Sequence, residues 1–472
     1  MKKLFLFLLL IIAASPISGA NKEKFLEELK KILADPYFNS AGISVDIFDL
    51  DDKKEIYSYD HQKLLHPASN MKVITTITAM EFLGIDYEFT TKLAGTGKLE
   101  NGIYTGDLYF IGGMDPDFTS HDLQKFTDHL VKSGVKEIRG NLYVDISLVD
   151  SLYWGVGWMW DDDPGSDFPY MTALNINDAG VKIFYESGKI GEPVNYRVEP
   201  YSDYYTVSNY SVTVAEDTSD LTITRGWKER NNEIQIKGFQ SVSETPDSIT
   251  INLYRPELYF LRLFEEQLQE SGILFYGKSD TGRVPVENKI MYKFSRFFDQ
   301  ILDNLNKESD NLSAEMTLRA LGLEGFGKPA SAENGIKMID SLITIIGLDP
   351  ENYRIVDGSG VSHYNLVTPE LMIALLNHIY YKYPDKYTRF EKSLPIAGID
   401  GTLENRMTRG EAYNKIFAKT GTLSGVSTLS GYANTNSGGK ISFSIFVQNF
   451  VGKTSRARYY QDRICELIVK YL

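Results

Sequence analysis

The chain has 472 residues and a formal net charge of −14, because 63 Asp and Glu outnumber 49 Lys and Arg. Hydrophobic residues make up 43% and charged residues 24% of the chain, which excludes disordered, collagen-like and coiled-coil classes and suits about two or three globular domains. The acidic balance argues against nucleic acid as a partner, and the one cysteine, Cys465, excludes an internal disulfide. We expect no metal and no cofactor.

Residues 1–20 have the pattern of a secretory signal peptide. Lys2 and Lys3 precede the apolar run Leu4–Ala14, and small residues lie at Ser18 and Ala20. The run is shorter than the roughly 18 apolar residues of a membrane-spanning helix, and no later stretch reaches that length. We therefore expect an exported protein, periplasmic or associated with the cell envelope, with no stable membrane span. An uncleaved anchor or a buried helix is the alternative.

Hydrophobic periodicity then divides the chain into three stretches. The first has a helix, two strands and a second helix, over Lys22–Leu33, Gly42–Leu50, Glu55–Tyr59 and Pro67–Leu83. The middle runs from Glu88 to about Lys289 and consists mainly of short β-rich segments, with Leu258–Ser271 as its one obvious helix.

The last stretch returns to helices and ends in strands. Its predicted helices cover Tyr292–Asn306, Leu312–Leu321, Asn334–Ile346 and Pro369–Tyr380. Three strands, over Asn414–Thr422, Thr428–Asn434 and Lys440–Gln448, and a closing helix over Arg456–Leu472 follow. We therefore expect a multi-domain α+β fold, in which residues 21–88 plus 289–472 form one discontinuous domain with an antiparallel sheet. A mostly β insert at 89–288, expected to contain two nested subdomains, interrupts this domain.

Ser69-Asn70-Met71-Lys72 is a Ser-x-x-Lys tetrad at a predicted helix start. Positions i and i+3 share one helix face, so the hydroxyl of Ser69 and the amine of Lys72 can meet. A serine hydroxyl is a weak nucleophile that needs a base, and lysine can be that base only when its pKa falls by about three units to near 7. The helix N-terminus also offers N–H groups to a developing oxyanion.

The tetrad alone is a weak signal, because about one or two chance matches are expected in a chain of this length. Two others occur, at Ser133–Lys136 and Ser437–Lys440. Each lies in a Gly-containing polar turn that leads into a strand, where the two side chains would not share a helix face. We interpret both as chance matches.

Ser309-Asp310-Asn311 lies at a turn between two predicted helices. A short loop of this kind can point a hydroxyl and an amide into a cleft. These residue types also commonly cap a helix, and capping of the helix that follows is the alternative role.

Lys419-Thr420-Gly421-Thr422 lies on a predicted strand near the C-terminus. Lys419 supplies a cation that could lower the pKa of Lys72 and attract a carboxylate. Gly421 leaves room for close approach of a ligand backbone, and Thr420 and Thr422 point to one side of the strand. An exposed, positively charged strand end is the alternative.

The order Ser-x-x-Lys, Ser-Asp-Asn, Lys-Thr-Gly, each in its required context, is typical of penicillin-recognising serine enzymes. The chain resembles the D-alanyl-D-alanine carboxypeptidase/endopeptidase family of low-molecular-mass class C penicillin-binding proteins over nearly its whole mature length. Further stretches that look like this family are Gly112–Pro116, Gly157–Asp162, Asp357–Gly360 and Ala397–Leu403. The resemblance implies a transpeptidase/β-lactamase-like α/β domain interrupted by mostly β inserted domains.

The resemblance also implies the catalytic roles. Ser69 would be the nucleophile that forms an acyl-enzyme, and Lys72 would be its base. Ser309 would relay a proton to the departing D-alanine, Asn311 would hold Lys72 and the substrate amide, and Lys419 would tune the electrostatics.

Substrate binding follows from the same resemblance. Thr420 and Thr422, flanking Gly421, would bind the terminal carboxylate, and the N–H groups of Ser69 and Thr422 would form the oxyanion hole. The expected partners are peptidoglycan stem peptides, with β-lactam antibiotics as inhibitors.

Asp162 looks like the acidic residue with which the family reaches the amino group of the stem peptide's diamino acid. The alternative is strong, because Asp161–Gly165 reads as a solvated acidic turn. The family pattern has an aromatic residue about five positions after this Asp, whereas here Asp167 occupies that position and Phe168 follows it.

Other functions remain open at this point. A β-lactamase or an esterase could use the same motifs, and a non-catalytic wall-binding protein could keep the same fold. A Ser-His-Asp reading with His66 and Asp357 is disfavoured, because His66 lies on the wrong side of the helix start, and we interpret it as a packing residue.

Overall fold

The computed structural model describes residues 19–472, and contacts divide the chain into two compact units. The first unit comprises residues 1–70 and 366–472, and the second unit comprises residues 71–365. The signal peptide predicted over 1–20 lies outside the described residues as far as residue 18. No helix among the described residues combines the length and the apolar character that crossing a membrane requires.

The first unit is an antiparallel sheet with helices packed on it. Its elements are α1 (Gly19–Leu33), the 3-10 helix η1 (Pro36–Asn39), β1 (Gly42–Asp49), β2 (Lys54–Tyr59), the 3-10 helix η2 (Ala68–Asn70), α8 (Pro369–Lys382), α9 (Pro384–Ser393), the 3-10 helix η6 (Gly401–Leu403), β18 (Ile416–Leu423), β19 (Val426–Asn434), β20 (Lys440–Gln448) and α10 (Thr454–Tyr471).

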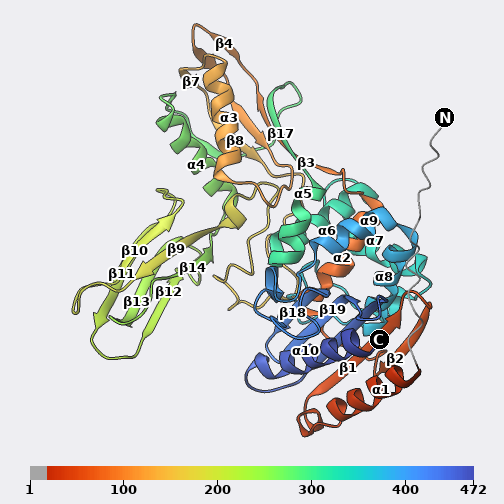
Figure 1. Ribbon diagram of the computed structural model, residues 1–472. Helices are drawn as coiled ribbons and strands as arrows, with labels where there is room; N and C mark the ends of the chain where they lie inside the picture. The colour runs from red at the N-terminus through yellow and green to blue at the C-terminus, as the bar shows by residue number, and fades with distance from the viewer. Residues whose placement is uncertain (1–18) are drawn as a thin grey trace, which may run out of the picture. The chain divides into compact units, whose positions relative to one another are not determined.

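The sheet has the strand order β18-β19-β20-β1-β2, with every pair antiparallel. It joins the two ends of the chain, because β1 from the N-terminal part pairs with β20 from the C-terminal part. Strands β19 and β20 are buried at nearly every position, which indicates that both of their faces are covered. Helix α10 packs on β19 and on α1, and α8 packs on β1 and β20 (Figure 1). Cys465 is buried in α10.

The second unit contains helices and four sheets. Its elements are α2 (Met71–Phe82), β3 (Glu88–Gly95), β4 (Lys98–Glu100), β5 (Ile103–Thr105), β6 (Leu108–Ile111), α3 (Ser120–Lys132), β7 (Glu137–Arg139), β8 (Leu142–Asp145), the 3-10 helix η3 (Asn177–Ala179), β9 (Gly180–Glu186), β10 (Asn195–Glu199), β11 (Thr206–Val214), β12 (Asp220–Arg225), β13 (Glu233–Ser241), β14 (Asp247–Asn252), α4 (Pro256–Glu270), β15 (Leu274–Phe275), β16 (Ser279–Thr281), β17 (Lys289–Phe297), α5 (Phe298–Asp303), the π-helix η4 (Asn304–Glu308), α6 (Asn311–Phe326), α7 (Ala332–Ile345) and the 3-10 helix η5 (Pro350–Asn352).

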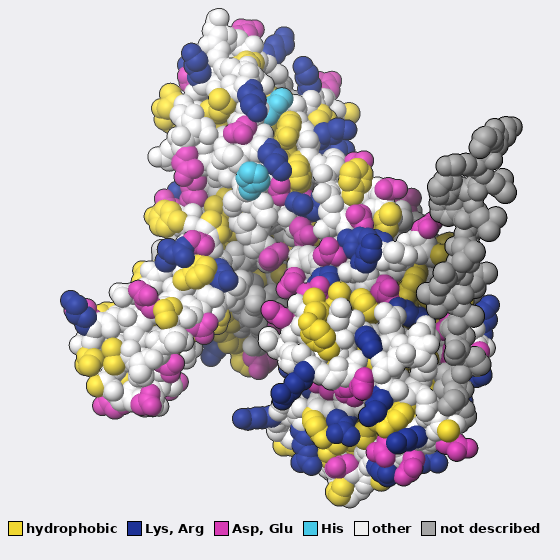
Figure 2. Space-filling view, in the orientation of Figure 1, with side chains coloured by type: hydrophobic (Ala, Val, Ile, Leu, Met, Phe, Trp, Pro, Cys, Tyr) yellow, Lys and Arg dark blue, Asp and Glu magenta, His cyan; other side chains and the backbone are white. Residues whose placement is uncertain are grey.

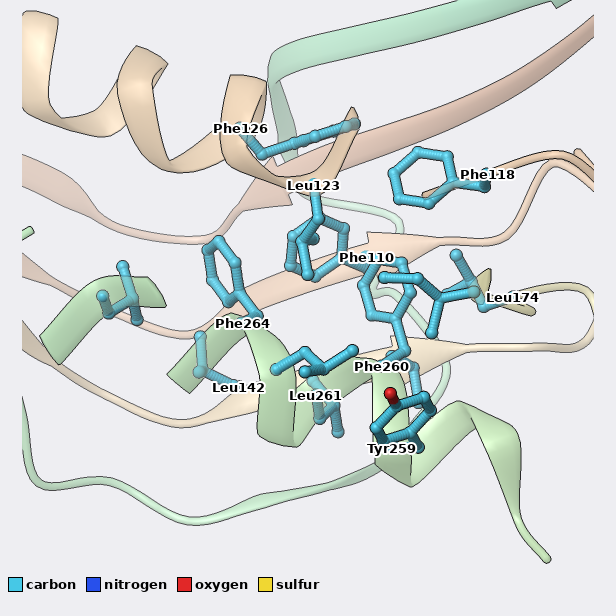
Figure 3. Packing of buried hydrophobic residues seen from close by; sticks show 14 of the residues in the cluster. Phe110, Phe118, Leu123, Phe126, Leu142, Leu174, Tyr259, Phe260, Leu261 and Phe264 are labelled. Atoms are coloured by element: carbon cyan, nitrogen blue, oxygen red, sulfur yellow. The ribbon is translucent and has the colours of Figure 1, made fainter. Parts of the chain in front are cut away.

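The four sheets of the second unit have the strand orders β16-β8-β6-β3-β17, β15-β7-β5-β4, β10-β9-β14 and β11-β13-β12. An aromatic core lies between α3 and α4, where Phe110 on β6 contacts Phe126, Phe260 and Phe264 at ring-centroid distances of 4.7–5.2 Å (Figure 3). Helix α2 packs on α6 and α7 and is buried from Met71 to Met80, as expected for a helix enclosed on all sides.

Two sequence-based expectations need correction. The predicted helix over Tyr292–Asn306 begins as a strand, because residues up to Phe297 belong to β17, which pairs antiparallel with β3. Helix α3 was missed, although a capping box between Thr119 and Asp122 marks its start. The remaining predictions agree closely with the observed elements, and the α+β class with an antiparallel sheet is confirmed.

Charged side chains are mixed over the surface. On the face shown in Figure 2, Lys and Arg side chains alternate with Asp and Glu side chains over the described residues, so neither sign dominates that face.

Candidate active site

Ser69 lies in the short 3-10 helix η2 of the first unit and is half-buried. The preceding residue, Ala68, has φ of 47°, a left-handed conformation that is costly for a residue with a side chain. The side-chain amide of Asn70 donates to the backbone carbonyl of Lys419 at 3.0 Å. This bond fixes the turn that carries Ser69 against strand β18 in the first unit.

Gly421 makes that close approach possible. A Cβ atom at this position would lie 2.2 Å from Oγ1 of Thr428, 2.8 Å from the carbonyl oxygen of Pro67 and 3.0 Å from Cβ of Ala68. The hydroxyl of Thr428 also donates to that Pro67 carbonyl at 2.7 Å. A side chain larger than hydrogen would therefore push the strand away from the turn.

The Lys-Thr-Gly motif lies on a strand, β18, as the sequence predicts. Lys419 is fully buried, and its Nζ donates to the carbonyl of Thr420 at 3.2 Å. The Thr420 hydroxyl shares a 2.7 Å hydrogen bond with the hydroxyl of Thr402, and the exposed Thr422 hydroxyl accepts from Arg458 at 3.2 Å.

Lys72 lies in the first turn of α2, in the second unit, and is fully buried. Its Nζ donates to Oδ1 of Asn311 at 2.5 Å and to the carbonyl of Ser359 at 2.9 Å. Asn311 is the first residue of α6, whose N-cap is Asp310, with a side chain that accepts from the Ser313 N–H at 2.6 Å. Within the Ser-Asp-Asn triplet, capping is therefore the role of Asp310, and Asn311 is left to contact Lys72.

Burial lowers the pKa of Lys72 to about 8, against the opposing effect of nearby carboxylates. Those carboxylates belong to Asp310, Asp357, Glu315 and Asp167, and each of them favours the charged amine. A lysine with this pKa has a substantial neutral fraction near neutral pH, which a proton acceptor needs.

Ser309 has a left-handed backbone, with φ of 65° and ψ of 33°. It ends the π-helix η4, and its N–H donates to the carbonyl of Asn304. A non-glycine residue in this conformation is held there by its surroundings, and such strain concentrates at functional sites. The sequence predicts a turn at this position, but it does not predict the left-handed backbone conformation of Ser309.

Glu315 is a buried carboxylate that the sequence analysis missed. Its Oε1 accepts from the N–H groups of Gly358 and Ser359, each at 2.9 Å, and its Oε2 pairs with Arg319 at 3.1 Å. Because Ser359 gives its carbonyl to Lys72, Glu315 orients an acceptor of that amine. The available signal was the spacing of four residues between polar positions 311, 315 and 319 of one helix.

Asp357 fixes the rest of the same loop. Its Oδ1 accepts from the Gly360 N–H and the Asn365 amide at 2.9 and 2.7 Å, and its Oδ2 accepts from the Ser362 N–H and the Trp158 indole at 2.8 and 3.1 Å. Burial, then the charge of a neighbouring carboxylate, raises the pKa of Asp357 to about 6. These hydrogen bonds show that the Asp357 carboxylate holds the loop of residues 357–365 in place.

Asp162 lies in a tight turn, and its carboxylate accepts from the Met159 N–H at 2.7 Å. Partial burial raises the pKa of Asp162. Nearby, the Asn311 amide donates to the carbonyl of Asp167 at 2.6 Å, and Phe168 packs against Trp158. Asp167 occupies the position at which the family pattern has an aromatic residue, and it contributes its backbone carbonyl oxygen to Asn311.

The other Ser-x-x-Lys matches are explained locally. Ser133 is the C-cap of α3, and the hydroxyl of Ser437 donates to the carbonyl of Leu472. The backbone of His66 makes two hydrogen bonds with the side chain of Gln448: the His66 N–H donates to Oε1, and Nε2 donates to the His66 carbonyl. Among the described residues, no group of three or more His, Cys, Asp and Glu could hold a metal ion.

Comparisons with known proteins identify the family. The D-Ala-D-Ala carboxypeptidase 3 (S13) family matches residues 25–468. The chain is 31% identical over 481 residues to the D-alanyl-D-alanine carboxypeptidase of Actinomadura sp. (strain R39), over 98% of this chain and 88% of that protein. It is 29% identical over 424 residues to D-alanyl-D-alanine carboxypeptidase DacB of Haemophilus influenzae, over 86% of each.

Solved structures agree with this family. The crystal structure of penicillin binding protein 4 (dacB) from Haemophilus influenzae matches with a TM-score of 0.83 and 26% identity, over 94% of this chain and 99% of that one. The structure of the same protein complexed with a β-lactam matches with a TM-score of 0.77 and 25% identity, over the same shares. The predicted family and enzyme class are confirmed: the chain belongs to the D-Ala-D-Ala carboxypeptidase 3 (S13) family and is a serine-type D-Ala-D-Ala carboxypeptidase.

Proposed function

We propose that Ser69 attacks the D-Ala-D-Ala bond of peptidoglycan stem peptides and that Lys72 is the general base that activates it. The observation that carries this assignment is the fully buried amine of Lys72, whose pKa burial lowers to about 8 and whose hydrogen bonds run to Asn311 and Ser359. Lys72 follows Ser69 by three residues, which is the spacing that lets a hydroxyl reach an amine at a helix start.

The reaction has two halves. In the first, Oγ of Ser69 bonds to the carbonyl carbon while its proton passes to Nζ of Lys72, and the C–N bond then breaks as Ser309 relays a proton to the amine of the departing D-alanine. In the second, water adds to the acyl carbon, gives up a proton, and releases the shortened peptide with Ser69 restored.

The remaining motif residues bind and orient the substrate in this proposal. Asn311 holds Lys72 and the substrate amide, and Lys419 provides positive potential. Thr420 and Thr422 bind the terminal carboxylate, and the N–H groups of Ser69 and Thr422 stabilise the oxyanion. The absence of a side chain at Gly421, which keeps β18 close to the Pro67–Asn70 turn, supports its place in the binding strand.

Asp162 is proposed to contact the amino group of the stem peptide's diamino acid, although the bond to Met159 already uses one of its oxygens. Endopeptidase action would cleave the same kind of D-Ala bond within a cross-link, and mass spectrometry of monomeric and cross-linked muropeptide products measures the balance. We also propose that the chain is exported to the cell envelope, which its N-terminal pattern supports.

The discontinuous domain of residues 21–88 and 289–472, interrupted by the insert at 89–288, is likewise a proposal. Its support is the sheet that joins β1 to β18–β20 across the chain, and the series of separate sheets within the insert. The contact units change at residues 70 and 365 instead, so the two divisions predict different protease-resistant fragments. Limited proteolysis followed by mass spectrometry separates them.

Labelling with penicillin tests the catalytic assignment. The protein should gain the mass of one penicillin, the adduct should map to Ser69, and Ser69→Ala should prevent labelling while the protein stays folded. Ser133→Ala, in a chance match of the tetrad, is the matched control and should label like the wild type. A folded wild-type protein without an adduct would overturn the proposal, and rapid turnover of a chromogenic β-lactam would favour a β-lactamase.

A further inference from the structure

All four tryptophans of the chain line one pocket of the second unit, although they come from two separate segments. Trp154, Trp158 and Trp160 belong to the loop before η3, and Trp227 follows β12. The pocket has a volume of about 820 Å³, which is large enough for a ligand of two or more rings. We propose that it binds the neutral glycan chain of peptidoglycan through its amino-sugar rings, an inference that rests on the proposed substrate.

The first argument is exposure. Trp160 is 71% exposed, and its ring centroid lies 5.2 Å from that of Trp227, at an interplanar angle of 39°. Trp227 is partly exposed, and an exposed tryptophan beside a second one in the lining of a pocket marks a binding surface. An indole ring presents an electron-rich face, against which the C–H face of a pyranose ring packs while its hydroxyl groups stay at the polar edge.

The second argument is charge. The carboxylate of Asp163 is paired with the buried guanidinium of Arg225, and Glu257 is paired with Arg255 at 3.0 Å. Both carboxylates in the wall of the pocket are thus paired with arginines, so the pocket offers no free carboxylate to a cationic ligand. Lys228 and Arg230 also line the pocket and are exposed, so they can donate to hydroxyl and acetamido oxygens, while their charge disfavours a cationic ligand.

The third argument is continuity with the environment of Lys72 inside the second unit. The Trp158 indole donates to Asp357, whose carboxylate anchors the loop that gives the Ser359 carbonyl to Lys72. The Trp154 indole donates to the carbonyl of Trp158 at 3.3 Å. A sugar chain held in this pocket would therefore contact Trp158, whose indole bonds the carboxylate that anchors the loop next to the proposed base.

Tryptophan fluorescence tests the proposal directly, because every fluorescent indole of the protein lines the pocket. Titration of the wild-type protein with a peptide-free β-1,4-linked N-acetylglucosamine tetramer should give a saturable change in emission. Calorimetry with the same sugar should show binding that weakens about tenfold or more in Trp160→Ala and in Trp227→Ala. Tyr276→Ala, which removes an exposed aromatic residue outside the pocket, should bind like the wild type.

Hydrolysis of a small D-Ala-D-Ala peptide separates this proposal from the catalytic one. Trp160→Ala should keep wild-type kinetics on the small peptide and lose rate on sugar-bearing polymer. Absence of any sugar response in the wild type, or sugar binding that Trp160→Ala retains, would overturn the glycan site. A fluorescence response to the free stem peptide without a response to the sugar would overturn it as well. Failure of small-peptide hydrolysis with intact sugar binding would instead count against the catalytic assignment.

Discussion

The two ends of the Ser-x-x-Lys tetrad differ in what holds them. Ser69 and Asn70 lie in a short turn of the first unit, fixed by the hydrogen bond from the Asn70 side chain to the Lys419 carbonyl on β18 and by the lack of a side chain at Gly421. Lys72 lies in a buried helix of the second unit, surrounded by carboxylates and held by Asn311 and Ser359. The position of the proposed nucleophile thus depends on close packing of its turn against β18, whereas the reactivity of the proposed base depends on burial and charge.

Lys72→Arg should produce the largest effect, because it leaves the turn unchanged and removes only the group that can become neutral. A guanidinium stays protonated, so acylation by penicillin should slow by about 10²–10⁴-fold. The rate constant of adduct formation by mass spectrometry is the measurement. Lys136→Arg, in a chance match of the tetrad, should acylate normally; near-wild-type acylation of Lys72→Arg would show that another group is the base.

The pH dependence of acylation should follow the state of Lys72 in the wild type. The active form is the neutral amine, and burial places its pKa at about 8, below its ordinary value of 10.5. The acylation rate constant should therefore fall about tenfold for each pH unit below 8 and reach a plateau above it. A rate that stays constant from about pH 6 to 9 would contradict this prediction.

Gly421→Ala tests whether close packing of β18 against the Pro67–Asn70 turn positions Ser69. The new Cβ would overlap Thr428 and the Pro67 carbonyl, so the strand must move and the protein should lose about 1–3 kcal/mol of stability. Acylation should slow because the turn carrying Ser69 shifts, with the pH at half-maximal rate unchanged. Gly42→Ala in the same sheet is the control, since its Cβ would meet only one atom within 4 Å, at 3.8 Å.

Glu315→Gln tests how far the charges around Lys72 control its reactivity, and we expect a smaller effect on the acylation rate. The Glu315 charge raises the pKa of Lys72, so its removal should lower that pKa and move the acid limb of the acylation profile to lower pH. The unpaired charge of Arg319 should lower the free energy of unfolding by about 1–3 kcal/mol. Glu333→Gln, which breaks an exposed ion pair with Lys337, should change neither quantity; an acid limb that moves to higher pH would contradict the assignment.

The element boundaries show where sequence reasoning succeeds and fails. The strands of the first unit were predictable, because each alternates or is continuously apolar and ends at turn residues. The stretch from Tyr292 fails because a row of aromatic residues fits both periods, and pairing of Phe294 with Thr91 across β17 and β3 decides for a strand. Such a partner lies about 200 residues away and leaves no local signal.

The sequence by itself determined the family, the enzyme class and the motif residues, because the motifs are short, ordered and each specific to a local structure. Tertiary structure alone decided the surroundings of those residues: the carboxylates around Lys72, the role of Glu315, the left-handed Ser309 and the gathering of four tryptophans in one pocket. The physical reason is that burial and charge at a site arise from groups distant in the chain, whereas a motif records only the groups adjacent in it.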